Sequence, residues 1–165
     1  QAEQAEAVLD GAQVEQQDKV DAARSKEATL ARKEAELVAG AKLPPMKQDA
    51  RGDVYTLAGD AFAGGQPQLT KAASASLKAL GIYLTALPSG SVQVLGYSDN
   101  QGKPAAIQSL SERRAQQVRA SLVAAGVSRS QITSQGKGAA APVADNRTAA
   151  GRAKNRRVEI IFSKK

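Results

Sequence analysis

The chain has 165 residues and a formal net charge of +7, and it contains neither cysteine nor histidine. These absences exclude disulfides, thiol nucleophiles, cysteine metal sites and every catalytic triad that depends on histidine. No apolar run approaches the roughly 18–20 residues that a membrane-spanning helix needs. The chain begins with glutamine, so we expect any targeting signal or membrane anchor to lie outside this sequence.

The charge divides the chain into two parts. Residues 1–46 carry nine acidic and six basic residues, a net charge of −3, whereas residues 47–165 carry seven acidic and seventeen basic residues, a net charge of +10. A basic module favours an anionic polymer, an anionic lipid surface or nucleic acid. With five aromatic residues in the whole chain, we do not expect a stacking platform for nucleic acid. We predict a helical extension over 1–46 and one globular domain over 47–165.

The first forty residues are rich in alanine, glutamine, glutamate and lysine and contain no proline, which predicts a helix. This helix is expected to end near Gly40, before the boundary at Leu43-Pro44-Pro45. Its large apolar residues are sparse, and the seven-residue spacing of Leu30 and Leu37 is not sustained over three heptads. Two interpretations stay open: a solvated helical spacer, or a coiled coil that joins two copies.

The globular part opens with alternating strand and helix patterns. Residues 53–58 predict a short strand, and a glycine-rich loop follows over 60–68. Residues 69–87 predict an amphipathic helix that ends at Pro88. Residues 91–96 carry little polarity and predict a buried central strand.

The second half repeats this alternation. A helix is expected to run through Leu110 to Ala125; its start is ambiguous, because Pro104 suits a first turn and Ser109 begins a capping box. The remaining predictions are a strand over 131–135, a loop over 137–145, a helical turn over 148–154 and a strand over 158–163. The order predicts a two-layer α/β sandwich, in which about four strands carry two main helices.

The segment from Leu95 to Ala115, LGYSDNQGKPAAIQSLSERRA, holds the candidate binding residues. It places Asp99 in a tight turn after an apolar strand, and it places Arg114 within the apolar face of the following helix. A guanidinium on a core-facing stripe must find an anion, because burying it unpaired costs a free energy of several kcal/mol. That anion is either Asp99 or the carboxylate of a ligand.

The runs GYSDNQG and LSERRA, followed by PVADNRTAAGRAKNRRVEI over 142–160, resemble the OmpA-like peptidoglycan-binding domain family. The resemblance implies a mixed sheet and a pocket for the diaminopimelate of the peptidoglycan stem peptide. It implies that Asp99 binds the ammonium group of that residue, that Arg114 binds its carboxylate, and that Arg156 is a further contact. It also suggests that Ser98 and Asn100 line the same pocket and that Leu110 forms its apolar wall.

The resemblance further implies a function without catalysis, cofactor or metal: the domain tethers a membrane-anchored parent protein to the cell wall. The expected location is the periplasm, at the outer membrane of a Gram-negative bacterium, as in an outer-membrane lipoprotein. The alternative is a protein-interaction or signalling module in which peptidoglycan binding is weak or lost. In either case the N-terminal helix is a candidate surface for a homodimer or for another envelope protein.

The sequence departs from the family pattern in three places. Tyr97 stands where the family commonly has histidine, and Ile107 stands where an asparagine is often found. The usual first-strand block is replaced by AFAGGQ over 61–66. Each lost hydrogen bond to a charged ligand costs roughly 1.5–3 kcal/mol, so we expect these departures to affect affinity more than fold.

Overall fold

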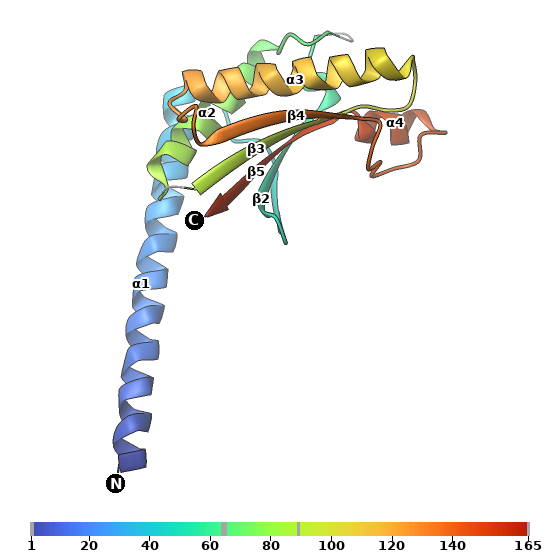
Figure 1. The fold of residues 1–165 in the computed structure, drawn as a ribbon. Helices are drawn as coiled ribbons and strands as arrows, with labels where there is room; N and C mark the ends of the chain where they lie inside the picture. Colours follow the sequence, from blue (N-terminus) through green and yellow to red (C-terminus); the bar gives the residue numbers. More distant parts are fainter. Residues whose placement is uncertain (1, 64–65, 89, 165) are drawn as a thin grey trace.

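The computed structural model describes residues 2–63, 66–88 and 90–164, with side chains from Gln13 onward. Its elements in chain order are α1 (Ala2–Ala39), β1 (Met46–Asp49), β2 (Gly52–Ala58), the 3-10 turn η1 (Gly59–Ala61), α2 (Lys71–Ala86), β3 (Gly90–Tyr97), α3 (Pro104–Ala124), β4 (Ile132–Gly138), α4 (Ala149–Asn155) and β5 (Arg157–Lys164) (Figure 1). Within the described part of the chain, no helix combines the length and the apolar character needed to span a bilayer.

The strands form one mixed sheet in the order β1-β2-β5-β3-β4. The pair β3 and β4 is parallel, and the other neighbours are antiparallel. The mixed sheet is confirmed, but it has five strands where the sequence predicted about four. The additional strand is β1, whose four residues MKQD are all exposed and show no apolar alternation. Its pairing with β2 across a tight turn, which includes Gly52 at a φ of 129°, defines it as a strand.

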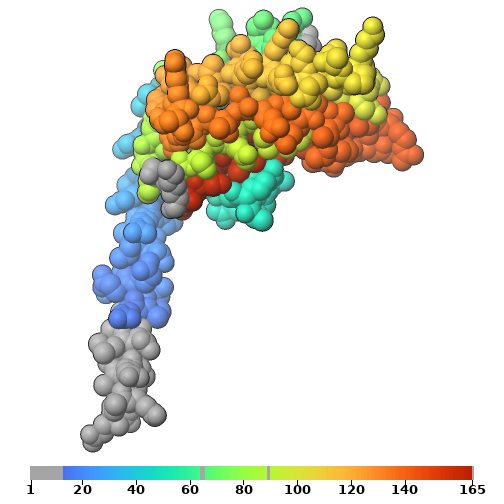
Figure 2. Space-filling view, in the orientation of Figure 1, coloured from blue at the N-terminus to red at the C-terminus, as the bar shows by residue number. Residues whose placement is uncertain are grey.

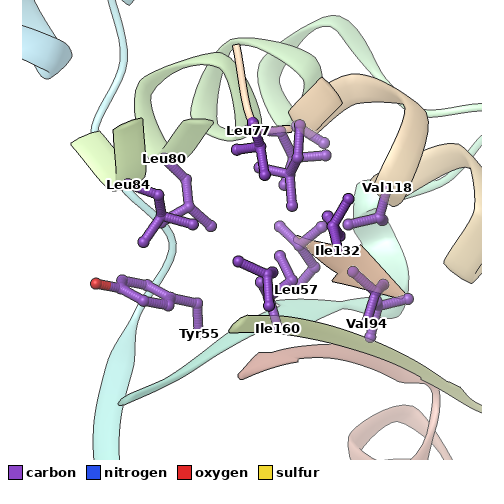
Figure 3. Packing of buried hydrophobic residues seen from close by; sticks show 14 of the residues in the cluster. Tyr55, Leu57, Leu77, Leu80, Leu84, Val94, Val118, Ile132 and Ile160 are labelled. Atoms are coloured by element: carbon purple, nitrogen blue, oxygen red, sulfur yellow. The ribbon is translucent and has the colours of Figure 1, made fainter. Parts of the chain in front are cut away.

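Helices α2 and α3 cover one face of the sheet, and the hydrophobic core lies between this helical layer and the sheet (Figure 1). Figure 3 shows the leucines of α2 above Val94 and Ile160 of the sheet, with Val118 of α3 beside them. The leucines Leu77, Leu80 and Leu84 are at most 2% exposed. The predicted two-layer architecture is therefore confirmed, because the amphipathic stripes of both helices meet one face of a single sheet.

The helix boundaries follow from local chemistry. Thr70 precedes α2, and its side chain accepts a 3.2 Å hydrogen bond from the N–H of Ala73. Helix α3 begins at Pro104, whose missing N–H costs nothing in the first turn. The capping-box interpretation of Ser109 is wrong, since Ser109 lies in the second turn of an established helix.

Helix α1 is one continuous helix whose last third docks on α2. Ala35 is fully buried in this contact, while Leu30 and Leu37 on the opposite side are 60% and 82% exposed. The linker that follows is tied to the helix, because the N–H of Leu43 donates to the Glu36 carboxylate at 3.0 Å. Figure 2 shows the stretch of α1 from Gln13 to the dock standing clear of the globular part.

The face of the sheet opposite the helices is also buried in its centre. Alternation in the last strand predicts a polar-leaning face there, yet Ile161 is 2% exposed and Glu159 is 5% exposed. Long side chains provide the cover: the guanidinium of Arg157 lies 4.0 Å from the centre of the Tyr97 ring, and Glu159 accepts from both Arg157, at 3.2 Å, and Arg51, at 2.9 Å. The outer face is thus sealed by an ion-pair network.

Candidate ligand-binding site

A cavity of about 660 Å³ lies where the end of β2, the middle of α3 and the end of α4 meet. Its walls combine two arginines with one aromatic ring, one carboxylate and small residues. The residues that line it are Ala58, Gly59, Asp60, Phe62, Arg114, Ala153 and Arg156. Two of the sequence-predicted site residues, Arg114 and Arg156, are therefore brought together in one cavity.

Asp99 joins this site through an ion pair. The residue is 5% exposed at the end of β3, and one carboxylate oxygen accepts from the N–H of Gln101 at 3.0 Å, which closes the turn. The other oxygen accepts from Nη1 of Arg156 at 2.8 Å. The sequence left two anions open for Arg114, and Asp99, the first of them, forms its ion pair with Arg156 instead. The register explains the difference, because Tyr97 of β3 pairs with Arg157 of β5 and so brings Asp99 beside Arg156.

Arg114 is 5% exposed and has a different set of partners. Its guanidinium lies 4.9 Å from the centre of the Phe62 ring, and its Nε donates to the carbonyl of Gln66 at 3.3 Å. Among the described residues, none of the ion pairs includes Arg114. Burial and the nearby charge of Arg156 lower the pKa of Arg114, whereas Asp99 acts to raise it. The site therefore contains a buried cation whose charge is incompletely compensated.

Close contact between α3 and the sheet sets the position of Arg114. A Cβ atom at Gly96 would meet the carbonyl oxygen of Ser111, and one at Gly136 would lie 2.5 Å from the backbone nitrogen of Glu112. The hydroxyl of Ser111 accepts from the N–H of Gly138 at 3.0 Å, and Ala115 is fully buried against the sheet. Ser111 and Ala115 of LSERRA thus pack α3 against the sheet, while Arg114 lines the cavity.

A fully buried asparagine fixes the loop on the other side of the cavity. The side-chain oxygen of Asn155 accepts from the N–H groups of Val143 and Ala144, at 2.7 and 3.0 Å, and its amide donates to Asn146 at 2.7 Å. Arg157 donates to the carbonyl of Asn155 at 3.2 Å from the outer face of the sheet. Arg156 therefore lies between Asn155 and Arg157, whose side chains are both fixed by hydrogen bonds. Only one arginine of the pair faces the cavity, as strand alternation requires.

The other predicted site residues lie outside the cavity wall. Ser98 is buried, and its N–H donates to the carbonyl of Gly138 at 2.7 Å. Asn100 is exposed beside the turn, and Leu110 is half-buried on α3. Sequence reasoning missed Phe62 and Asp60, which lie in or beside the segment that departs from the family pattern. It also missed Asn155, whose anchoring role depends on a loop contact that no local pattern signals.

Comparison with known proteins identifies relatives of this domain. The family model described as "OmpA family" matches residues 61–156. The chain is 39% identical over 102 residues to the probable lipoprotein YiaD of Escherichia coli strain K12, an alignment that covers 62% of this chain and 47% of the relative. It is 45% identical over 80 residues to the peptidoglycan-binding protein ArfA of Mycobacterium tuberculosis, with 48% of this chain and 24% of the relative covered.

Solved structures agree with this assignment. The structure described as the cell wall anchor of the T6SS from Pseudomonas aeruginosa aligns with a TM-score of 0.61 at 33% identity, covering 68% of this chain and 82% of that chain. The chain spans about half or less of the length of the curated relatives it matches. The family model, in contrast, covers more than half of this chain and reaches from η1 through α4. The chain belongs to the OmpA family.

Proposed function

We propose that this protein binds peptidoglycan, without catalysis, through the diaminopimelate of the stem peptide. The single observation that carries the proposal is Arg114, a buried cation that lines a cavity without a carboxylate partner among the described residues. Taking such a charge out of water costs free energy, which a ligand carboxylate offsets when it binds the planar guanidinium.

The ion pair beside Arg114 supplies the complementary half of the site. Diaminopimelate ends in an ammonium and a carboxylate on one carbon, so it needs an anion and a cation at a fixed separation. Asp99 is the anion and Arg114 the cation of this scheme. Arg156 is the further contact: its side chain is 42% exposed, so it can turn toward the ligand when the ammonium takes its place on Asp99.

The relatives support the same function. ArfA is described as a peptidoglycan-binding protein, and the structural neighbour is described as a cell wall anchor. YiaD is described as a probable lipoprotein, and another relative is an outer membrane porin F. We propose a periplasmic location, with attachment to the outer membrane. Helix α1, with 38 residues and about 57 Å of length at 1.5 Å per residue, serves as the spacer.

The test is calorimetric titration with a diaminopimelate-containing stem peptide, beside the same peptide containing lysine. Lysine lacks only the terminal carboxylate that Arg114 is proposed to bind, so we expect at least about tenfold weaker binding of that peptide. Arg114→Ala and Asp99→Ala should each abolish binding. Arg113→Ala, an exposed neighbour on α3, is the matched control and should leave binding unchanged.

Three outcomes contradict the proposal. Equal binding of both peptides removes the role of the carboxylate, and wild-type affinity in Arg114→Ala and Asp99→Ala removes the site. If the wild-type protein binds neither peptide, the domain keeps its fold without its wall ligand. The protein-interaction function, with α1 as the contact surface, then takes its place.

A further inference from the structure

A second groove lies beside the cavity and shares two of its walls. The groove has a volume of about 410 Å³, and Ala58 and Asp60 line both spaces. Its own walls come from the linker after α1, from β2 and from the start of α2. The residues that line it are Lys42, Leu43, Pro44, Pro45, Thr56, Leu57, Ala58, Asp60, Ala61, Thr70, Ala72, Ala73 and Ser76. The cavity and the groove therefore adjoin at the end of β2.

The edge of the sheet is open where the two spaces meet. Met46 pairs with Tyr55, and the N–H of Thr56 donates to the carbonyl of Pro45 at 3.0 Å. Alternate residues of a strand direct their backbone groups to the same side, so the N–H and C=O of Ala58 point to this edge as well. The linker does not continue the pairing, because the N–H of Leu43 is bonded to Glu36 instead. Within the described residues, Ala58 has no strand beside it on this edge.

The proline pair in the linker keeps this edge open. Neither Pro44 nor Pro45 has an N–H, so Pro45 cannot donate to the carbonyl of Thr56, the β2 residue that it faces on this edge. An open strand edge binds an extended peptide through main-chain hydrogen bonds. The groove adds small side chains and the hydroxyls of Thr56 and Ser76. It has no aromatic residue among its walls, which disfavours a sugar ring as its occupant.

We propose that the groove binds the main chain of the stem peptide next to the diaminopimelate residue, with the peptide paired to the edge of β2 at Ala58. This inference rests on the proposed function, since the diaminopimelate must first be held at Arg114. It adds a second subsite, one that recognises peptide length and backbone rather than a charged group.

A ligand series separates the two subsites. We would titrate the ¹⁵N-labelled protein by NMR with free diaminopimelate, with a diaminopimelate-containing stem peptide and with the same peptide on its disaccharide. The wild-type protein should bind the peptide about tenfold or more tightly than the free amino acid. Ser76→Trp fills the groove from α2 and should remove this gain while leaving the affinity for free diaminopimelate unchanged. Ser74→Trp, exposed on the same helix and outside the groove, is the matched control.

A backbone substitution tests the hydrogen bond itself. Ala58 has a φ of −72°, close to the value that proline imposes, so Ala58→Pro removes the N–H with little strain. This variant should lower the ratio of peptide affinity to free diaminopimelate affinity, whereas Ala58→Ser, which keeps the N–H, should not. Thermal unfolding of each variant establishes that the fold is intact.

The outcomes distinguish this inference from the proposed function. If free diaminopimelate and the peptide both fail to bind the wild-type protein, the proposed function fails, and the subsite fails with it. If both bind but Ser76→Trp and Ala58→Pro keep the full peptide gain, the subsite alone is overturned. If Ser76→Trp weakens only the disaccharide-bearing ligand, the groove holds the glycan, and the peptide assignment is wrong.

Discussion

The two arginines of the site differ in how their charges are compensated. Arg156 makes a 2.8 Å ion pair with Asp99 and is 42% exposed on its side chain, so water and the carboxylate share its charge. Arg114 is almost fully buried over the Phe62 ring, and burial lowers its pKa. A residue kept in such an environment reduces stability in the unbound protein, which is common where binding groups are held ready for a ligand.

Replacing Arg114 by an apolar residue of similar length should therefore separate stability from binding. We expect Arg114→Met to abolish stem-peptide binding while raising the free energy of unfolding by about 1 kcal/mol, because the buried charge is removed and methionine packs well against an aromatic ring. Urea denaturation measures the stability. Arg113→Met, on the exposed side of α3, should change it by less than about 0.5 kcal/mol. A loss of more than about 2 kcal/mol in Arg114→Met would show that Arg114 is chiefly structural.

The sequence predicted which charged residues belong to the candidate site, but it did not predict which of them form ion pairs. Arg114 stood out because a charge fell on an apolar helical stripe, a local signal. Asp99 and Arg156 are fifty-seven positions apart along the chain. Their ion pair depends on β5 lying beside β3 in the sheet. Phe62 and Gln66 reach Arg114 from a segment whose sequence shows no periodic pattern. Long-range register and irregular loops therefore limited the prediction of the site.

At the scale of elements, the packing of α3 on β3 and β4 determines the site. Glycines at positions 96 and 136 let the helix backbone approach the strands, and Ser111 bonds the helix to the N–H of Gly138. Arg114 lies one turn after Ser111 on the same helix, so its position over the cavity follows from this contact. The motif LSERRA is thus an element-packing motif, in addition to its proposed role in ligand binding.

A methyl group at Gly96 should disturb both fold and site. Gly96→Ala places a Cβ against the carbonyl of Ser111, so α3 must move outward. We expect the free energy of unfolding to fall by about 1–3 kcal/mol, as for other overpacked contacts, and the stem-peptide affinity to fall with it. Chemical denaturation and calorimetry measure the two effects. Gln93→Ala, on an exposed position of the same strand, is the control. If Gly96→Ala is destabilised but keeps its affinity for the stem peptide, the position of α3 does not determine binding.

The elements that the sequence predicted well are those with a strong apolar period. Helix α2 and strands β2, β3 and β5 lie within two residues of their expected bounds, because each presents a clear face to one core. Strand β1 was missed because its four exposed residues carry no such pattern. The start of α3 was ambiguous because two capping signals competed, and the proline at the first position prevailed.

At the scale of the whole molecule, the centre of the sheet is buried on both faces, although α2 and α3 pack against one face alone. The helices cover the inner face, and the network around Arg157 and Glu159 covers the centre of the outer face. Tyrosines occur on both sides: burial raises the pKa of Tyr55 beside the helices and of Tyr97 beneath Arg157. The folded state therefore holds these phenols in their neutral form.

Alkaline pH should destabilise the protein through these tyrosines. In the unfolded chain Tyr55 ionises near its ordinary pKa of 10, whereas burial, with the charges of Tyr83 and Asp53 adding to it, raises the pKa in the fold. The folded state then binds more protons, so stability is complete below pH 10 and falls above it, by up to about 1.4 kcal/mol per pH unit for one group. Urea denaturation at pH 8, 10 and 11 measures this decline, which should be less steep in Tyr55→Phe. Parallel profiles in both proteins would contradict this account.

The alanine contact between α1 and α2 also decides how the molecule responds to force. Figure 1 shows α1 leaving the domain on the side away from α4. A force applied between the N-terminal helix and the cavity is therefore transmitted through the whole globular part. Because the contact runs lengthwise along α1 over its last third, tension along the helix axis loads its residues together, in shear. A contact loaded in shear resists better than one peeled open residue by residue. In the proposed role of α1 as a spacer, this contact would therefore resist a steady load along the helix axis and would give way when the helix is pulled sideways.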